Sequence, residues 1–179
     1  MKTTQILFAG FGGQGILFSG KFLAYKGLVE ELQVSWLPSY GPEMRGGTAN
    51  CNVILSDSPV GSPIITAPDV LVAMNLPSLQ KYVDTVVSGG QIYVDSSLIN
   101  VKVERDDVEV FYIPATQMAK DEGISTLANM VIVGHLLENH PELSFEGTSG
   151  VVEKLVPPKK AALKELNMKA LDMGRNYNK

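Results

Sequence analysis

Short hydrophobic runs alternate with amphipathic stretches along most of the chain, and the first such pair is the clearest. Residues 6–9 are apolar, residues 10–15 are rich in glycine, and residues 16–27 are amphipathic. An apolar run, a glycine-rich break and a helical period, in that order, predict a strand, a tight turn and a helix. The chain therefore begins with a β-α unit.

The same alternation continues along the chain and predicts an α/β fold. Residues 69–74 form an unbroken apolar run, which is typical of a strand buried on both faces of a parallel sheet. The predicted strands cover residues 6–9, 33–37, 49–56, 69–74 and 91–94. The predicted helices cover residues 16–27, 76–87, 117–121, 127–139 and 157–174. Strands that alternate with helices favour a mostly parallel sheet between helical layers.

Two stretches predict short strands outside this alternation. Turn residues surround an extended piece at residues 57–63, which suggests a small hairpin beside the main sheet. Residues 101–103 and 108–110 alternate in polarity on either side of a charged segment, 104–107, as two strands joined by a solvated turn would. We therefore expect a three-layer α/β sandwich whose mostly parallel sheet carries a small antiparallel extension.

Residues at the ends of the predicted helices suit caps. Asn75 precedes the second helix, Ser125 or Thr126 precedes the fourth, and Gly174 can end the last helix in a left-handed conformation. The fourth helix, 127–139, is apolar nearly all round, and this pattern predicts burial on several sides. A contact with another subunit is one way to provide part of that burial.

Length, charge and hydropathy bound the class of protein. A chain of 179 residues suits one α/β domain, 1–179, with a sizeable core. Its net charge of −4 argues against a nucleic-acid binder, because such proteins usually carry a basic face. No apolar run reaches the ~18 residues that suggest a membrane span, and the first residues do not resemble a signal peptide. We expect a cytoplasmic protein with no membrane partner.

Few residues offer metal, redox or nucleophilic chemistry. Cys51 is the only cysteine, so an internal disulfide is excluded and the four thiolates of an iron–sulfur cluster are not available. His135 and His140 are the only histidines, and without a cysteine cluster they give no metal ligand set. We expect both to be structural. Asp95 follows a predicted strand and is better explained as a turn or capping residue than as a ligand residue.

The glycine-rich turn is the first candidate ligand site. Gly10, Gly12, Gly13, Gln14 and Gly15 lie in a G-x-G-x-x-G pattern between a predicted strand and a predicted helix. Gly10 and Gly12 would let the backbone turn sharply and approach a ligand, while Gly15 would let the helix pack on the strand. The N-terminus of the helix would then favour an anion. The alternative is a glycine-rich connection that only packs a helix closely on a sheet.

A dinucleotide site would also need an acid at the end of the second strand, to bind the ribose hydroxyls. The predicted strand 33–37 runs into Pro38 without a carboxylate, and Glu30 and Glu31 come too early. The turn thus lacks the ribose half of a nicotinamide or flavin site.

A second glycine-rich segment, residues 39–48, has neither helical nor strand periodicity. Tyr40 supplies a phenol, Glu43 an acid and Arg45 a permanent cation with five donors. The simple alternative is a surface loop. However, ordering a glycine-rich segment costs conformational entropy, and a packing partner or a ligand normally offsets that cost.

Together these motifs resemble one family, the γ subunit or equivalent domain of the 2-oxoacid:ferredoxin (flavodoxin) oxidoreductases. The resemblance covers nearly the whole chain, and its most specific part is the run from Tyr40 to Thr48. The segments that carry it are 10–15, 39–49, 62–63, Asp69 with 74–75, 95–97, 129–130 and 167–174.

The resemblance implies a Rossmann-like unit in a complex that converts a 2-oxoacid and coenzyme A into acyl-CoA and CO2 while reducing ferredoxin. It implies that this chain binds no cofactor alone, and that thiamine diphosphate and the iron–sulfur clusters belong to thiamine-binding and ferredoxin-like sister subunits. The chain would pack on the thiamine-binding subunits and help form the coenzyme A side of the active site. The implied ligand residues are Gly10, Gly12, Gly13, Gln14, Gly15, Ser39, Tyr40, Gly41, Glu43, Arg45, Gly46, Gly47 and Thr48.

Two other functions stay open from the sequence. One is a stand-alone oxidoreductase that binds NAD or FAD, against which the missing ribose acid counts. The other is a nucleotide- or coenzyme A-binding module without chemistry. Within the family, the resemblance points to 2-oxoglutarate or a branched-chain 2-oxoacid ahead of pyruvate.

Overall fold

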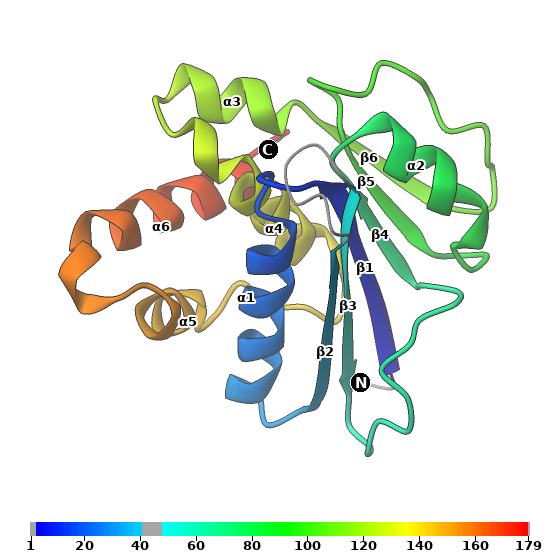
Figure 1. The fold of residues 1–179 in the computed structure, drawn as a ribbon, viewed down its shortest axis with the longest axis horizontal. Coiled ribbons are helices and arrows are strands. Elements are labelled where there is room, and N and C mark those ends of the chain that lie inside the picture. The colour runs from blue at the N-terminus through cyan, green and yellow to red at the C-terminus, as the bar shows by residue number, and fades with distance from the viewer. Residues whose placement is uncertain (1–2, 41–47, 179) are drawn as a thin grey trace.

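The computed structural model describes residues 3–40 and 48–178. Its six strands are β1 (Thr3–Phe11), β2 (Gln33–Tyr40), β3 (Thr48–Ser56), β4 (Val70–Ala73), β5 (Gln91–Asp95) and β6 (Glu109–Ile113). Its six α-helices are α1 (Ile16–Val29), α2 (Leu76–Tyr82), α3 (Ala115–Asp121), α4 (Ala128–Asn139), α5 (Thr148–Leu155) and α6 (Ala161–Arg175). The strands form one sheet in the order β2-β3-β1-β4-β5-β6 (Figure 1).

Most of the sheet is parallel, as the alternation of strands and helices predicts. β1, β4, β5 and β6 run in one direction. β3 lies between β1 and β2 in the sheet and is antiparallel to both of them. This confirms the α/β fold with a mostly parallel sheet and an antiparallel extension.

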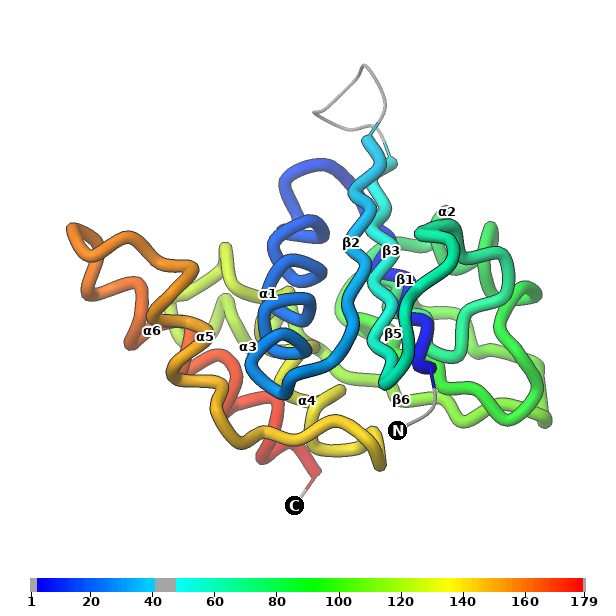
Figure 2. The backbone as a smooth tube through the Cα atoms, turned by 90° about the horizontal axis from the view of Figure 1, so that it is seen from below, coloured from blue at the N-terminus to red at the C-terminus, as the bar shows by residue number. Residues whose placement is uncertain are grey.

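The two faces of the sheet are covered by different helices, which makes three layers. Ile6 and Phe8 of β1 belong to the core beneath α1, α4, α5 and α6. Leu7 and Ala9 belong to a second core, on the side of α2. Figure 2 shows α2 across the sheet from α1, α5 and α6. The period-2 alternation of β1 therefore supplies both cores at once.

The antiparallel extension lies elsewhere than the sequence predicts. Residues 57–63 form no strand, and residues 101–105 form none either. β2 instead extends beyond residue 37 to Tyr40, and β3 begins at Thr48, because the two strands pair up to Tyr40 and Ala49. Pro38 within β2 is tolerated because β2 is an edge strand.

The predicted hairpin over 101–110 is wrong for a physical reason. Val103 and Val108 are half buried against the second core, so their alternation reports packing on one face and not pairing with each other. The N–H group of Val103 donates to the hydroxyl of Tyr112 at 2.8 Å. Only residues 109–113 pair, in parallel with β5.

α4 is the central helix, and its neighbours lie within the described chain. Every residue from Ala128 to Leu137 is buried, so no subunit contact is needed to explain its composition. Gly134 of α4 and Gly174 of α6 mark the crossing of these two helices. A Cβ atom on Gly134 would overlap the backbone of Leu171, and one on Gly174 would overlap that of Val131.

The predicted caps have mixed outcomes. Asn75 does cap α2, because its Oδ1 atom accepts a hydrogen bond from the backbone N–H group of Ser78 at 2.8 Å. The cap at Ser125 or Thr126 is wrong: both residues lie in a 3-10 turn, and α4 starts without a side-chain cap. Gly174 is not the end of α6, since it lies inside the helix and serves helix packing. α5 was not predicted.

Candidate functional site

A cavity of about 290 Å³ opens at the carboxyl end of β1. The glycine turn forms one wall, residues 16–18 of α1 form another, and Tyr40 and Thr48 close the side toward the β2–β3 hairpin. The carboxyl ends of parallel strands are where ligands bind in α/β sheets. Among the predicted ligand residues, those that line this cavity are Gly12, Gly13, Gly15, Tyr40 and Thr48.

The backbone requires glycine at two positions of the turn, and these are not Gly10 and Gly12, at which the sequence predicts the sharp turn. Gly13 has a φ angle of 96° and Gly15 one of 77°, in the left-handed region that other residues rarely adopt. Gly15 precedes α1 and provides no side-chain cap. The first N–H groups of a helix have no partner inside the helix, and together with the helix dipole they attract anions. Chemically, this wall of the cavity suits a phosphate or a carboxylate.

Gln14 closes the turn with its side chain. Its Oε1 atom accepts a hydrogen bond from the N–H group of Phe11 at 2.6 Å, and its Nε2 atom donates to the carbonyl oxygen of Met74 at 2.8 Å. A Cβ atom on Gly10 would lie 2.7 Å from Oε1, so Gly10 leaves the room that this side chain needs. Gln14 therefore ties the end of β1 to the end of β4.

Gly15 packs against a different partner from the predicted one. A Cβ atom on Gly15 would lie 2.6 Å from the side-chain amide of Asn129 in α4, so the close approach is to that residue and not to the strand beneath. The Nδ2 atom of Asn129 donates to the carbonyl oxygen of Gly15 at 3.2 Å and to the hydroxyl of Ser19 at 3.0 Å. Sequence reasoning gave Asn129 no role, and its only local signal is an amide inside an apolar helix.

The second glycine-rich segment, residues 39–48, here called the second motif, contributes residues from its two ends to the cavity. Tyr40 is 58% exposed, Ser39 precedes it in β2, and Thr48 begins β3. The other predicted ligand residues of this motif lie outside the described residues: Gly41, Glu43, Arg45, Gly46 and Gly47.

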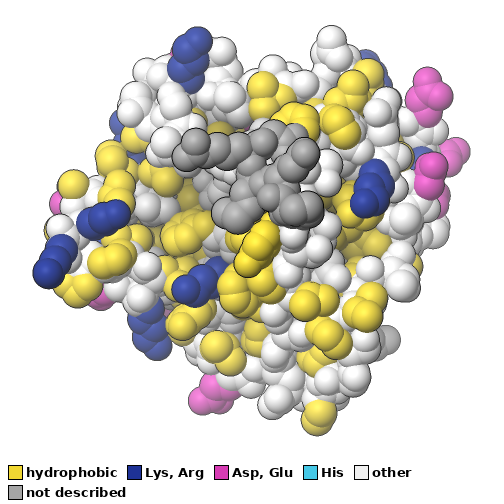
Figure 3. Space-filling model, in the orientation of Figure 1, with side chains coloured by type: hydrophobic (Ala, Val, Ile, Leu, Met, Phe, Trp, Pro, Cys, Tyr) yellow, Lys and Arg dark blue, Asp and Glu magenta, His cyan; other side chains and the backbone are white. Residues whose placement is uncertain are grey.

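Exposed aromatic residues lie at the cavity and near it. Phe11 is 37% exposed and lines the cavity, as Tyr40 does. Trp36 is 39% exposed and shares the α1 face of β2 with Tyr40. Figure 3 shows hydrophobic side chains on this face of the molecule. A face of this kind suits a protein partner.

The sheet order does not suit a dinucleotide. In a dinucleotide-binding fold the second strand lies directly beside the first, and an acid at its end binds the ribose. Here β3 separates β2 from β1, and the described end of β2 is Pro38, Ser39 and Tyr40. The described end of β2 therefore offers no acid that could bind a ribose in the way a dinucleotide-binding fold does.

Asp95 is a capping residue, as predicted. It is fully buried, and its Oδ2 atom accepts a hydrogen bond from the hydroxyl of Thr116 at 2.5 Å. Its Oδ1 atom accepts from the backbone N–H group of Ser97 at 3.1 Å. The carboxylate thus joins the end of β5 to the start of α3.

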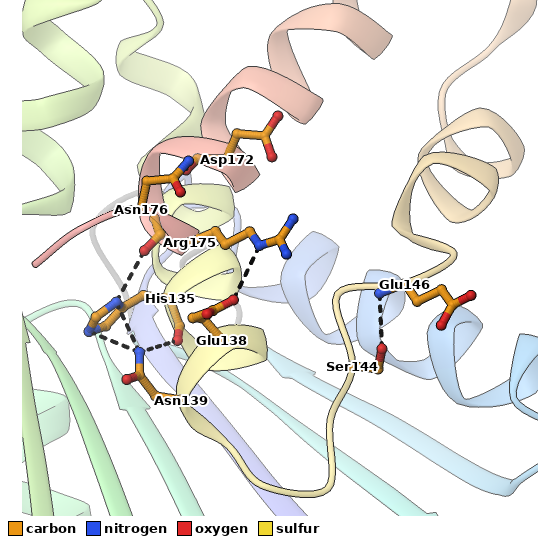
Figure 4. Close-up of polar contacts among 9 residues, drawn as sticks. His135, Glu138, Asn139, Ser144, Glu146, Asp172, Arg175 and Asn176 are labelled. Atoms are coloured by element: carbon orange, nitrogen blue, oxygen red, sulfur yellow. Dashed lines mark hydrogen bonds and ion pairs between the residues drawn. The ribbon is translucent and has the colours of Figure 1, made fainter. Parts of the chain in front are cut away.

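The histidines have structural contacts. The Nδ1 atom of His135 lies 3.1 Å from the carbonyl oxygen of Gly174, and the amide of Asn139 contacts the same ring (Figure 4). Burial lowers the pKa of both His135 and His140, which keeps them neutral near pH 7. In the described part of the chain, no three His, Cys, Asp or Glu side chains could hold a metal ion together.

Cys51 does not suit an iron–sulfur cluster. Cys51 lies on β3 and is fully buried beneath Gly20 of α1. Burial raises its pKa to about 12, and a hydrogen bond to Trp36 acts in the opposite direction by lowering the pKa. Among the described residues, no helix has the length and apolar character to cross a membrane.

Comparison with known families and proteins gives a consistent result. Residues 5–177 match the family described as pyruvate ferredoxin/flavodoxin oxidoreductase. The 2-oxoglutarate synthase subunit KorC of Methanothermobacter marburgensis is 35% identical over 178 residues, which cover 96% of this chain and 94% of KorC. The ketoisovalerate oxidoreductase subunit VorA of Methanothermobacter thermautotrophicus is 42% identical over 133 residues, 74% of this chain. The chain spans only 28% of the length of VorA.

Two solved structures share the fold. The γ subunit of a keto/oxoacid ferredoxin oxidoreductase from Geobacter sulfurreducens has a TM-score of 0.84 and 32% identity, and the match covers 97% of this chain and 95% of that one. The 2-oxoglutarate:ferredoxin oxidoreductase of Magnetococcus marinus, solved with 2-oxoglutarate, coenzyme A and succinyl-CoA, has a TM-score of 0.87 and 26% identity. That match covers 98% of this chain and 31% of the other.

Proposed function

The chain belongs to the pyruvate ferredoxin/flavodoxin oxidoreductase family, and we propose that it is the γ subunit of a multi-subunit 2-oxoacid:ferredoxin oxidoreductase. The observation that carries the proposal is the end-to-end match with KorC, which covers 94% of that subunit. In the proposed reaction, a 2-oxoacid and coenzyme A give acyl-CoA and CO2, and two electrons pass to ferredoxin.

The chain needs sister subunits for this chemistry. Its single thiol is buried and cannot supply a cluster, so we assign the iron–sulfur clusters and thiamine diphosphate to other subunits. The same unpaired thiol supports a cytoplasmic location, where thiols stay reduced. The surface that we propose packs on the thiamine-binding subunits carries the exposed aromatic side chains of Trp36 and Tyr40 on β2.

We assign the cavity at the end of β1 to coenzyme A. Its glycine turn and the start of α1 suit the phosphates, and its remaining wall is largely apolar. The solved relative from Magnetococcus marinus, which holds coenzyme A, supports a site of this class. The names of the relatives support 2-oxoglutarate or a branched-chain 2-oxoacid as the second substrate.

Reconstitution tests the proposal. The chain is co-expressed with a thiamine-binding subunit and a ferredoxin-like subunit from the same source, and viologen reduction is followed with 2-oxoglutarate, 2-oxoisovalerate or pyruvate. We expect reduction that requires coenzyme A, one preferred 2-oxoacid and this chain. Equal coenzyme A-dependent activity of the sister subunits without the chain would reject the proposal.

A further inference from the structure

The geometry points to Gln14 as a positioning residue that holds the glycine turn in the orientation needed to bind coenzyme A. This inference rests on the proposed function, because it concerns the same cavity. Gln14 would act through the backbone of the turn and not by touching the ligand. The turn is the glycine-rich segment 10–15, whose first two residues end β1 and whose last residue precedes α1.

Both ends of the Gln14 amide are used inside the chain. Oε1 accepts from Phe11, the last residue of β1, and Nε2 donates to Met74, the first residue after β4. The backbone N–H group of Gln14 also donates to the carbonyl oxygen of Phe11 at 3.2 Å. One residue therefore forms three hydrogen bonds that join the turn to two neighbouring strands of the sheet.

A second amide holds the other end of the turn. Asn129 donates to the carbonyl oxygen of Gly15 and to the hydroxyl of Ser19, and that hydroxyl donates back to Gly15 at 3.2 Å. Asn129 is 2% exposed, so its contacts are shielded from water. The turn is thus held at Phe11 by Gln14 and at Gly15 by Asn129.

Gly12 and Gly13, which lie between these two anchors, have no side chains that could fix their conformation. Gly12 and Gly13 line the cavity, and glycine loses more conformational freedom on ordering than any other residue. A site that is ordered before binding does not pay that entropy when the ligand arrives. Gln14 and Asn129 therefore hold Gly12 and Gly13 in place in the free protein, and loss of the Gln14 hydrogen bonds should weaken anion binding selectively.

The test uses the assembled complex and a matched pair of variants. Gln14→Met keeps the length of the side chain and removes both hydrogen bonds. Gln117→Met is the control, since Gln117 lies on the exposed face of α3 and its Nε2 atom bonds only Asp121, at 2.6 Å. The readouts are hydrogen exchange over residues 10–18 without ligand, kcat, and KM for coenzyme A and for the 2-oxoacid.

For Gln14→Met we expect faster exchange over residues 10–18 and a KM for coenzyme A raised about tenfold, as loss of one to two hydrogen bonds implies. The kcat value and the KM for the 2-oxoacid should stay within about twofold, since only the coenzyme A site is altered. Gln117→Met should change none of these quantities. If Gln14→Met does not assemble, Gln14→Glu replaces it, because a carboxylate still accepts from Phe11 but cannot donate to Met74.

Faster exchange with an unchanged KM for coenzyme A would overturn the inference, because the orientation of the turn would then not matter for binding. Equal increases in both KM values would also overturn it, since they would show general damage. These outcomes leave the proposed function intact. A wild-type complex without coenzyme A-dependent turnover would instead reject the proposed function, and this inference with it.

Discussion

At the scale of single residues, burial decides the behaviour of the one thiol. Cys51 is fully buried and burial raises its pKa to about 12, so the thiol stays protonated at pH 8 and is shielded from reagents. We predict that Ellman's reagent does not react with the native chain at pH 8 and reacts with one thiol per chain in 8 M urea (roughly a fully unfolding concentration). Rapid reaction of the native chain would show that α1 opens away from β3 easily.

His135 should make stability depend on pH. Burial lowers its pKa, against the opposing effects of the Gly174 carbonyl and Glu138. The unfolded chain therefore binds a proton first as pH falls below about 6.5, so the stabilisation by neutral His135 is complete above that pH and is lost below it. We predict that the free energy of unfolding falls as the pH drops below about 6.5, by at most ~1.4 kcal/mol per pH unit for each buried histidine.

His135→Gln checks the assignment, with urea unfolding measured across this pH range. Its pH dependence should be weaker than that of the wild type but should not vanish, because His140 also has a lowered pKa and remains. Arg175 and Glu138 form an ion pair beside the ring and are unchanged in the variant (Figure 4). An identical slope in the two proteins would assign the pH dependence to other groups.

Arg45 carries the prediction that comes from the sequence alone. It is the one permanent cation of the second motif, and a charge-assisted hydrogen bond to a phosphate contributes about 1.5 to 3 kcal/mol. We expect Arg45→Ala to raise the KM for coenzyme A about ten- to a hundredfold in an intact complex. Arg175→Ala is the control, since Arg175 lies at the end of α6 in an exposed ion pair. Failure of the Arg45 variant to assemble would make Arg45 an interface residue.

The sequence predicts which residues form the turn, but it does not predict which distant residues they contact. The glycines followed from their spacing between a strand and a helix. The role of Asn129 could not be predicted, because its partner Gly15 is 114 positions away and no local pattern connects the two. Gln14 lies inside the predicted motif, but its bond to Met74 depends on the pairing of β1 with β4.

At the scale of elements, the crossing of α4 and α6 depends on two glycines. We predict that Gly174→Ala lowers the free energy of unfolding by about 3 kcal/mol, because its Cβ atom would overlap the backbone of Val131. The gain in helix propensity of about 1 kcal/mol is smaller than this cost. Gly150→Ala in α5 is the matched control, since its Cβ atom would meet nothing within 4 Å.

The control should stabilise the chain by about 0.5 to 1 kcal/mol. Urea unfolding of both variants measures the difference. If both substitutions stabilise the chain, α4 and α6 do not approach each other as closely as the structure shows.

Element prediction succeeded where burial and pairing coincide, as in β4 and β5, which are fully buried and became inner parallel strands of the sheet. It failed at residues 101–105, where alternation reflects packing against one core without a strand partner. It also failed at β2, which continues through Pro38 because β3 pairs with it along its whole length. Periodicity indicates which side of a segment is buried. Whether the segment forms a strand, and where that strand ends, depends on pairing partners that are distant in sequence.

At the scale of the whole molecule, the sheet order gives a prediction about ligands. β3 separates β2 from β1, and no acid stands at the described end of β2, so the described residues lack the ribose-binding acid of a dinucleotide site. We predict that the isolated chain is colourless and binds neither NAD nor FAD at 100 μM (about the upper range of typical cofactor affinities). Equilibrium dialysis and absorbance spectra measure this, and stoichiometric flavin or nicotinamide would favour a stand-alone oxidoreductase.

The same sheet order sets the sequence of events during synthesis. β1 is made first, yet both of its partners, β3 and β4, follow residue 47. At roughly 5 to 20 residues per second, the apolar strand β1 waits for some seconds before β3 is complete. A β-hairpin forms within microseconds, so we expect β2 and β3 to pair soon after they emerge and β1 to dock on them. The nascent chain is therefore most open to aggregation and to chaperone binding in the interval between the first strand and the third.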